Sequence, residues 1–232
     1  MGECIALLFG GRDDRPTVRT ITIFTTRKDF MSSDGLQLIQ PAVLAGGRSR
    51  RFGRDKLVEP LHDALLIDHP IRTLREVFGP RVGIVGECAP RVASRADMVI
   101  PDPYPGIGPI GGLLAALEYA RGPVFLLAGD LAAITPETIR RILAAAAAPG
   151  EEEAGEAESV EPLAIIAATD RPQPCIGLYR PQAAAYLRRA LSDERFALRH
   201  AIPAAHVRLV EVAAEAARNI NRPDDLVNRK NR

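Results

Sequence analysis

The sequence contains no tryptophan, only three cysteines and four histidines, and almost no net charge. Cys4, Cys88 and Cys175 are odd in number and far apart, which argues against a disulfide framework and fits a reducing cytoplasm. The histidines do not have the spacing of metal ligands. A formal net charge of +1 gives no overall field that would attract nucleic acid or an anionic membrane. We therefore expect a cytoplasmic protein that holds any acidic ligand through local groups.

Long apolar runs are also absent, since none approaches the ~20 residues that span a bilayer. The short apolar stretch at residues 1–9 has no basic region before it, unlike a signal peptide. What the chain does have is 232 residues, 47% of them hydrophobic and 25% charged, which is ordinary for a globular protein. That length is enough for one large domain with a substantial core, or for two small domains.

The first 36 residues carry no clear periodic pattern. Charged residues at 12–15 and Pro16 interrupt it, although the run 18–26 is rich in Thr and Ile and could form one strand. We treat residues 1–36 as an N-terminal extension of unclear role and residues 37–232 as one domain. We also hypothesise that residues 1–30 are dispensable. Loss of folding or activity after deletion to Met31 would contradict this hypothesis.

From residue 38 onward, strand-like runs alternate with helical patterns. We predict strands at 38–44, 82–85, 98–100, 124–128, 163–168, 175–179 and 207–212. We predict helices at 70–78, 110–120, 136–147, 181–191 and 194–201, with Thr135 and Pro136 as an N-cap and first helical position. Pro41 in the first strand belongs at a strand edge rather than in its centre. The stretch 148–162 is acidic with little to bury, which predicts a flexible loop.

Repeated strand–helix units predict a Rossmann-like, three-layer α/β sandwich with a mostly parallel sheet. The runs 163–168 and 175–179 are close enough in sequence to pair antiparallel. Ligands of such folds bind beyond the carboxyl ends of the strands. We therefore expect the loops after Leu44, Ile100 and Ala128 to share one crevice.

The loop at residues 44–56 reads LAGGRSRRFGRDK. Its glycines let the backbone approach a ligand closely, and free N–H groups can form an anion nest. The loop also has three positively charged side chains that can bind phosphate, namely Arg48, Arg51 and Lys56. The loop matches neither the dinucleotide fingerprint GxGxxG nor the Walker loop. A tight turn with solvated arginines is the alternative.

Two aspartates follow predicted strands. Asp102 lies in the loop PDPYPGIGPIGG at 101–112, which opens a helix whose N-terminus attracts anions. Asp130 directly follows the apolar run 124–128, where a carboxylate is well placed to bind Mg²⁺ beside substrate phosphates. The alternatives are an Asp102 that rigidifies a proline turn and an Asp130 that caps a helix or a turn.

Taken in order, these segments resemble the molybdenum cofactor guanylyltransferases, which are MobA-like nucleotidyltransferases. The first loop is similar to LAGGxSxRMGxDK, with Phe52 in place of Met, the second to Asp…GPLAG, and GDLA at 129–132 to CDMP. QPCIGLYR at 173–180 is similar to QPLxALYR, and NINRPDDL at 219–226 to NxNTPEDL. The resemblance covers about residues 38–228.

The resemblance implies a fold of the nucleotide-diphospho-sugar transferase type and a Mg²⁺-dependent transfer of GMP. GTP would donate GMP to the terminal phosphate of molybdopterin or the molybdenum cofactor, with pyrophosphate released. The nucleotide-binding residues it implies are Leu44, Ala45, Gly46, Gly47, Arg48, Lys56, Asp102 and Asp130. Lys56, Asp130 and Arg51 would be catalytic, Asp130 would hold the metal, and Gln173, Asn219 and Asn221 would lie on the pterin side. Molybdoenzymes or their chaperones are further candidate partners.

Other readings stay open at this stage. Gly46 favours guanine over cytosine, since cytidylyl-transferring relatives usually have LAAG, but the asparagine expected after the second strand is replaced by Gly86-Glu87-Cys88. A second possibility is another nucleotidyltransferase, using CTP with a pterin or GTP with another phosphorylated acceptor. A third is an inactive nucleotide-binding docking module. The presence of Lys56, Asp102 and Asp130 together argues against the third.

Overall fold

A computed structural model describes residues 6–9, 17–20, 33–45, 55–148, 161–221 and 224–225. Gly46, Gly47, Arg48 and Arg51 lie outside the described residues, as do residues 149–160 of the acidic stretch. The roles predicted for those four residues and the predicted flexibility of that stretch therefore stay predictions.

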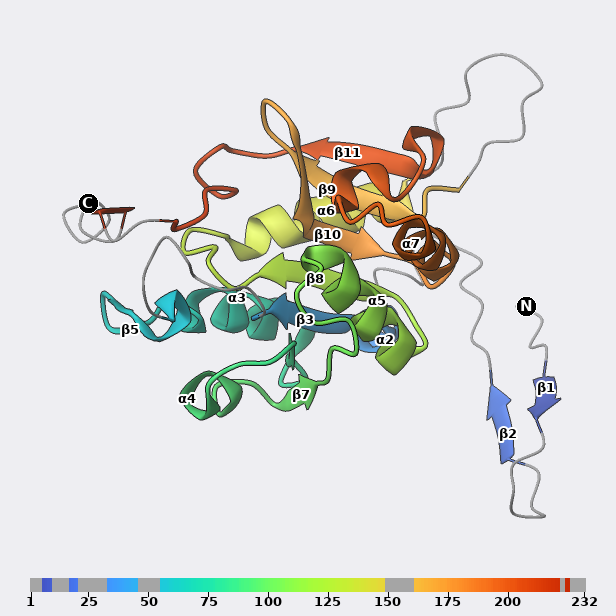
Figure 1. Cartoon of the computed structure of the whole chain (residues 1–232), viewed down its shortest axis with the longest axis horizontal. Helices are drawn as coiled ribbons and strands as arrows, with labels where there is room; N and C mark the ends of the chain where they lie inside the picture. Colours follow the sequence, from blue (N-terminus) through green and yellow to red (C-terminus); the bar gives the residue numbers. More distant parts are fainter. Residues whose placement is uncertain are drawn as a thin grey trace.

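A seven-stranded sheet forms the centre of the described chain, in the order β11-β9-β10-β8-β3-β6-β7 (Figure 1). Its strands are β3 (Gln40–Leu44), β6 (Gly83–Val85), β7 (Met98–Ile100), β8 (Val124–Ala128), β9 (Ala164–Ala168), β10 (Pro172–Tyr179) and β11 (Val207–Glu211). Strand β10 runs antiparallel to β8 and β9, and the other neighbouring pairs are parallel. The mostly parallel sheet and the antiparallel pairing of β9 with β10 are thus confirmed.

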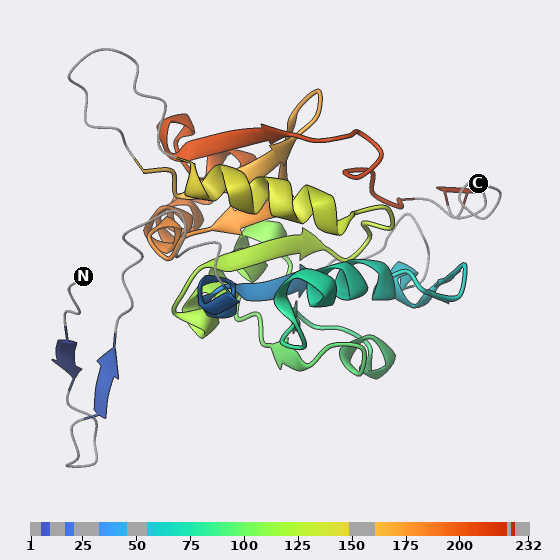
Figure 2. The same ribbon diagram turned by 180° about the vertical axis from the view of Figure 1, so that it is seen from behind.

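Helices cover both faces of this sheet. Helices α3 (Asp68–Phe78) and α6 (Pro136–Ala147) lie on the face seen in Figure 2, and α5 (Pro109–Ala120) and α7 (Ala183–Ser192) on the face seen in Figure 1. Successive strand residues point to opposite faces. Accordingly, Val43 packs with the α3 and α6 side chains, whereas Ala42 packs with those of α5 and α7. The predicted three-layer α/β sandwich is confirmed.

Two helix ends follow from local chemistry that the sequence displays. The Thr138 amide donates to the Thr135 hydroxyl, so Thr135 caps α6 and Pro136 begins it. Helix α3 ends at Gly79, whose φ of 77° suits glycine and whose amide donates to the Arg75 carbonyl. Both predicted boundaries are confirmed.

Pro41 does not lie on an edge strand, which corrects the expectation from its sequence. Strand β3 is central, between β8 and β6. Pairing with β6 begins only at Ala42, opposite Gly83, so Pro41 precedes that ladder although it already pairs with β8 at Phe125. A proline without an N–H is tolerated there because the second ladder has not yet begun.

The predicted start of that strand was two residues early. Helix α2 (Ser33–Leu38) ends at Leu38, and β3 starts at Gln40. Leu36 of α2 packs against the core beside α3 and α6. Helix α2 therefore crosses the border that we placed between residues 36 and 37.

The predicted helix at 194–201 is wrong. Glu194 has a left-handed φ of 54°, which stops α7, and only a single 3₁₀ turn, η2 (Leu198–His200), follows. Four of the eight residues in this stretch are apolar, but only Leu198 and Ala201 are buried.

Several short elements were not predicted. They are η1 (Lys56–Val58), the β4 (Pro60–Leu61) and β5 (Ala64–Leu65) hairpin, α4 (Pro90–Ala93) and η3 (Ala204–His206). Near the N-terminus, β1 (Ala6–Phe9) pairs antiparallel with β2 (Thr17–Thr20), which overlaps the start of the predicted strand 18–26. Among the helices of the described ranges, none has the length and apolar character needed to span a membrane.

Candidate active site

The loops singled out in the sequence leave the same edge of the sheet. Backbone hydrogen bonds join the strand ends: the Gly129 amide donates to the Leu44 carbonyl at 3.0 Å, and the Ala45 amide to the Val85 carbonyl at 3.0 Å. The Gly86 amide donates to the Ile100 carbonyl at 3.1 Å. The adjacency of the loops after Leu44, Ile100 and Ala128, which we predicted from the parallel order, is therefore present.

The strongest polar contact at this edge joins two of the predicted site residues. Nζ of Lys56 lies 2.5 Å from Oδ2 of Asp130. The side chains of Lys56 and Asp130 are only 19% and 11% exposed. A charge-assisted hydrogen bond so shielded from water is much less screened than an ion pair on the surface. The structure therefore brings together a cation and a carboxylate that are far apart in sequence.

Local structure holds Lys56 in this position. Lys56 begins the 3₁₀ turn η1, which Asp55 caps by accepting a hydrogen bond from the Leu57 amide at 3.0 Å. The Leu57 side chain is buried in the core beside α3. In the Asp55-Lys56 pair of the first motif, Asp55 thus caps the turn and Lys56 supplies the cation. Leu57, the next residue, anchors both in the core.

Asp130 is fixed by the tight packing of Gly129 before it. A Cβ at Gly129 would lie 2.9 Å from the Leu44 carbonyl oxygen, 2.9 Å from Cδ1 of Ile67 and 3.1 Å from Cδ2 of Leu57. Only glycine fits this position without a shift of its neighbours. The Gly-Asp pair of this chain therefore suits the close packing at this position.

A third participant, Ile220, was missed by sequence reasoning. Its amide donates to the Asp130 carbonyl at 3.0 Å, and its carbonyl accepts a hydrogen bond from Nζ of Lys56 at 3.0 Å. The only signal in the sequence was an apolar residue between Asn219 and Asn221. Those two asparagines are exposed on either side of the buried Ile220. The predicted pterin-side segment is therefore joined directly to the Lys56–Asp130 pair.

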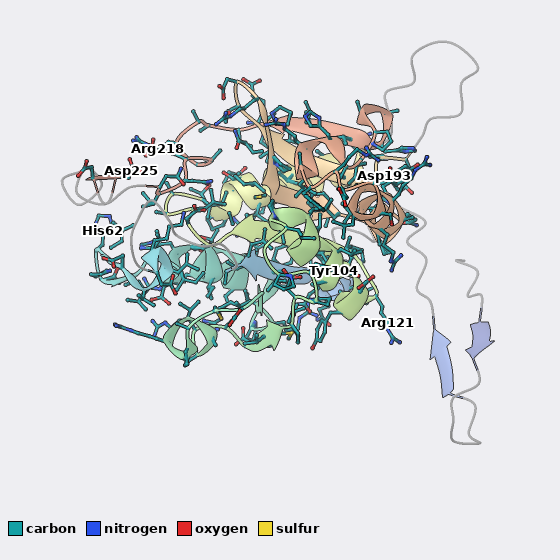
Figure 3. All side chains as sticks on the ribbon, in the orientation of Figure 1. His62, Tyr104, Arg121, Asp193, Arg218 and Asp225 are labelled. Carbon is teal, nitrogen blue, oxygen red and sulfur yellow. The ribbon has the colours of Figure 1, made fainter. Side chains whose placement is uncertain are left out.

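A second set of contacts orders the end of this segment. The Asn221 amide donates to Oδ2 of Asp225 at 2.9 Å, and Arg218 lies 3.8 Å from Oδ1 of the same carboxylate. Figure 3 shows Arg218 and Asp225 together near the C-terminal end of the chain. The Asn221 backbone is thus held, while its side chain remains exposed.

Asp102 follows β7 and braces its own loop. Its Oδ1 accepts a hydrogen bond from the Tyr104 amide at 2.8 Å, which is the turn-stabilising role considered as the alternative. Its Oδ2 lies 3.9 Å from where a Cβ of Gly112 would be, in the first turns of α5. Leu44 packs at the same glycine, so Asp102 also lies close to the end of β3. The structure thus shows the turn-stabilising role of Asp102 through Oδ1, and the predicted nucleotide contact stays a prediction.

Gln173 is not brought into contact with the Lys56–Asp130 pair in the described part of the chain. Its Nε2 donates to the Thr169 hydroxyl at 3.1 Å, within the β9–β10 turn. The register of β10 shifts between Gln173 and Gly177, and Cys175, which lies in this bulge, is near Asp130. Burial of the thiol, and then the Asp130 carboxylate, raises the pKa of Cys175 to about 12. Cys175 is therefore a neutral thiol at physiological pH.

The stretch Gly86-Glu87-Cys88 stands where an asparagine was expected after β6, and Cys88 contributes a second thiol there. Burial, and then the charge of Asp55, raises the pKa of Cys88. Cys88 therefore lies near the residue that caps the Lys56 turn. Both Cys88 and Cys175 are free thiols.

Comparisons with known proteins agree with this geometry. A family model described as the MobA-like NTP transferase domain matches residues 41–209. A molybdenum cofactor guanylyltransferase of Rhizobium johnstonii is 31% identical over 210 residues, which cover 82% of this chain and 90% of that protein. A probable molybdenum cofactor guanylyltransferase of Opitutus terrae is 36% identical over 129 residues, 54% of this chain and 64% of that protein.

A solved structure is also similar. Molybdopterin-guanine dinucleotide biosynthesis protein A of Archaeoglobus fulgidus superposes with a TM-score of 0.64 at 27% identity, over 83% of this chain and 97% of that one. The family model spans the whole sheet from β3 into β11, together with Lys56, Asp102 and Asp130. The chain therefore belongs to the MobA-like NTP transferase family, the family that its motifs predicted.

Proposed function

We propose that this protein transfers GMP from GTP to the terminal phosphate of molybdopterin or of its molybdenum-loaded form. The observation that carries the proposal is the shielded Lys56–Asp130 pair at the carboxyl edge of the sheet, joined through Ile220 to the segment of Asn219 and Asn221. The molybdenum cofactor guanylyltransferases among its relatives support the choice of donor and acceptor.

The proposed chemistry needs positioning more than a protein nucleophile. An oxygen of the acceptor phosphate attacks the α-phosphorus of GTP, and a new P–O bond forms. The bond from that phosphorus to the bridging oxygen breaks, and pyrophosphate leaves with the electron pair. A phosphate monoester is already a competent nucleophile, so no Ser, Cys or His has to be activated. The residues of the site have to align the two phosphates and neutralise their charge.

The donor side is assigned from both structure and motif. Leu44 ends β3 and Ala45 follows it, at the edge where Lys56 and Asp130 meet. Lys56 is the cation proposed to contact the phosphate chain, and Asp102 a nucleotide contact near the start of α5. The roles proposed for Gly46, Gly47, Arg48 and Arg51 rest on the family motif alone.

Asp130 is the proposed ligand of a divalent cation, for which we propose Mg²⁺. It is a buried carboxylate whose Oδ2 already holds one cationic group, the ammonium of Lys56. No cluster of three or more His, Cys, Asp or Glu side chains occurs in the described ranges, so the described residues offer fewer than three such ligands. Such a sparse donor set fits Mg²⁺, which is often held by one or two carboxylates plus substrate phosphates and water. Bound there, the ion would neutralise phosphate charge during transfer.

We propose that Lys56 has two partners in turn, first Asp130 and then the phosphates of the nucleotide. In the ligand-free protein the ammonium neutralises Asp130. A metal ion bound there would give Asp130 a second cationic partner, and Lys56 could then contact phosphate oxygens of the nucleotide. Lys56 and Asp130 neutralise each other, which limits the cost of burying these two groups.

The acceptor side is assigned to Gln173, Asn219 and Asn221. The exposed amides of Asn219 and Asn221 can donate to and accept from a pterin or its phosphate. We place the reaction in the cytoplasm because the described cysteines are free thiols, as a reducing compartment would leave them. Molybdoenzymes or their chaperones remain candidates to receive the product.

The test is a defined reaction with the purified full chain, GTP, Mg²⁺ and molybdopterin, followed by mass spectrometry of the dinucleotide and an assay of pyrophosphate. Parallel reactions contain CTP, ATP or UTP, or GTP without acceptor. Formation of the guanine dinucleotide only when GTP and molybdopterin are both present supports the proposal. A cytosine dinucleotide would instead make the protein a cytidylyltransferase. Nucleotide binding without pyrophosphate release in any reaction would make it an inactive docking module.

A further inference from the structure

Ile220 contacts both charged residues of the candidate site through its backbone. Its amide donates to the carbonyl of Asp130, and its carbonyl accepts a hydrogen bond from Nζ of Lys56, each at 3.0 Å. Backbone groups cannot reach another position without moving the chain. The place of Ile220 therefore controls two contacts of the site at once.

What holds Ile220 in place is its side chain. It is fully buried and packs with Leu61 and Leu66 in a small hydrophobic cluster apart from the two main layers, with Ala132 beside it. Leu61 belongs to the β4–β5 hairpin, and the Leu66 amide just after that hairpin donates to the Glu59 carbonyl at 2.9 Å. The hairpin missed in the sequence thus forms a socket for one residue of the C-terminal segment.

The residues on either side of Ile220 behave differently. Asn219 and Asn221 are exposed, whereas Ile220 is fully buried. One buried apolar side chain between two exposed asparagines can fix this segment of the chain and still leave the asparagine side chains able to bind a ligand. The position of the asparagines relative to Lys56 and Asp130 depends on this anchor.

We propose that Ile220 is a positioning residue, whose buried side chain fixes the acceptor-binding asparagines relative to the Lys56–Asp130 pair. The inference rests on the proposed function for the identity of the acceptor. It adds that the alignment of acceptor and donor depends on an apolar socket that touches neither substrate. Loss of the anchor is expected to disturb the acceptor side and the transfer step more than the nucleotide itself.

The experiment compares Ile220→Ala with Ile39→Ala, both of which remove the same atoms from a buried isoleucine. Ile39 is 1% exposed and lies before the amino end of β3, away from the candidate site. Both variants should lower the melting temperature. Only Ile220→Ala should raise the KM for molybdopterin and lower kcat, each by about tenfold or more, because small misplacements at a reacting centre are costly. The Kd of Mg²⁺–GTP should change by less than about threefold, and Ile220→Val should recover most of the loss.

An acceptor KM and kcat for Ile220→Ala within about twofold of those of Ile39→Ala would overturn the proposal and leave Ile220 a core residue only. So would equal losses in both variants. If Ile220→Ala does not fold, Ile220→Val against Ile39→Val makes the same comparison, with a smaller effect expected only in the former. Failure of the proposed function is seen separately, because wild-type protein would then form no guanine dinucleotide at all.

Discussion

The ammonium of Lys56 lies 2.5 Å from Oδ2 of Asp130, although 74 positions separate the two residues in the chain. Lys56 ends the first motif and begins the turn η1, and Asp130 lies just after the end of β8. The fold therefore joins two motifs that the sequence shows only as separate segments. Each residue is expected to depend on the other, both in the free protein and during transfer.

Neutralising either member of this pair should reduce turnover severely. Lys56→Met and Asp130→Asn are each expected to lower kcat by about a hundredfold or more, because each removes charge stabilisation at the phosphates. The double variant should lose less than the product of the single losses, since the two residues act as a unit. Steady-state pyrophosphate release measures the turnover of all three variants.

Asp193→Asn, which alters an exposed ion pair with Arg195 on the surface after α7, is the control, and its turnover should be near that of the wild type. Near-normal turnover of Lys56→Met or Asp130→Asn would refute the role of that residue.

Lys56 should compete with a divalent cation for Asp130. Titration of Mn²⁺, followed by electron paramagnetic resonance, is expected to show weak binding to the free protein and stronger binding when GTP is present. Lys56→Met should strengthen binding to the free protein on the order of tenfold, because it removes the resident cation. Lys56→Arg keeps the charge and serves as the control. A Lys56→Met variant that binds Mn²⁺ no more tightly than the wild type would contradict this competition.

Gly129→Ala should disturb the site through packing alone. The new Cβ would meet the Leu44 carbonyl oxygen at 2.9 Å, and that oxygen cannot retreat without losing its hydrogen bond from the Gly129 amide. We expect a loss of about 1–3 kcal/mol in the free energy of unfolding and a fall in kcat through displacement of Asp130. Denaturant unfolding and turnover measure the two effects. Gly122→Ala, whose Cβ would be 3.3 Å from its nearest neighbour, should be milder. A Gly129→Ala variant as stable and active as the wild type would contradict this prediction, because the residues around the new Cβ would then move without cost.

Asp68 should make the protein sensitive to acid. Burial alone raises the pKa of Asp68, but the Arg95 side chain, at 2.6 and 2.7 Å, and the Leu65 amide outweigh it and leave the pKa below its usual value. A lowered pKa in the folded state adds stability above the ordinary carboxyl pKa, and this contribution is lost as pH falls through the lowered value. Asp68→Asn should cost roughly 2 kcal/mol at pH 7.

The difference in unfolding free energy between wild type and Asp68→Asn should therefore shrink below about pH 4. Denaturant titrations at pH 7 and at acid pH measure it. Asp63→Asn is the matched control, because its ion pair with Arg72 is exposed and should contribute little. A difference that stays constant from pH 7 into the acid range would contradict the role assigned to the Asp68 carboxylate.

The periodicity of the sequence predicted the layers and most of the strands of the sheet. Those features depend on long apolar runs such as residues 124–128 and on strong caps such as Thr135. The β4–β5 hairpin, with two residues in each strand, and the four-residue α4 were missed because elements so short have no measurable period. Pro41 misled because its effect depends on where the neighbouring strand begins, which only the fold determines.

The adjacency of the strand ends beside Asp102 and Asp130 was predictable from the parallel strand order, while the roles of Lys56, Asp102 and Asp130 stay predictions. Ile220 was not predictable from its side chain, because it contributes an amide and a carbonyl, which every residue has. The hydrogen bond of Gln173 within its own turn was also beyond the sequence, since it depends on a bulge in β10. The roles of Gly46, Gly47, Arg48 and Arg51, like the dispensability of residues 1–30, stay predictions.

Nucleotide affinity tests the central claim most directly. Calorimetric titrations of GTP, CTP, ATP and UTP in the presence of Mg²⁺ should be made on the wild type and on Asp130→Ala. We predict binding that is selective for GTP and is weakened by Asp130→Ala. A preference for CTP, affinity unaffected by Asp130→Ala, or no binding of any nucleotide would contradict a guanylyltransferase that holds its metal–nucleotide complex through Asp130.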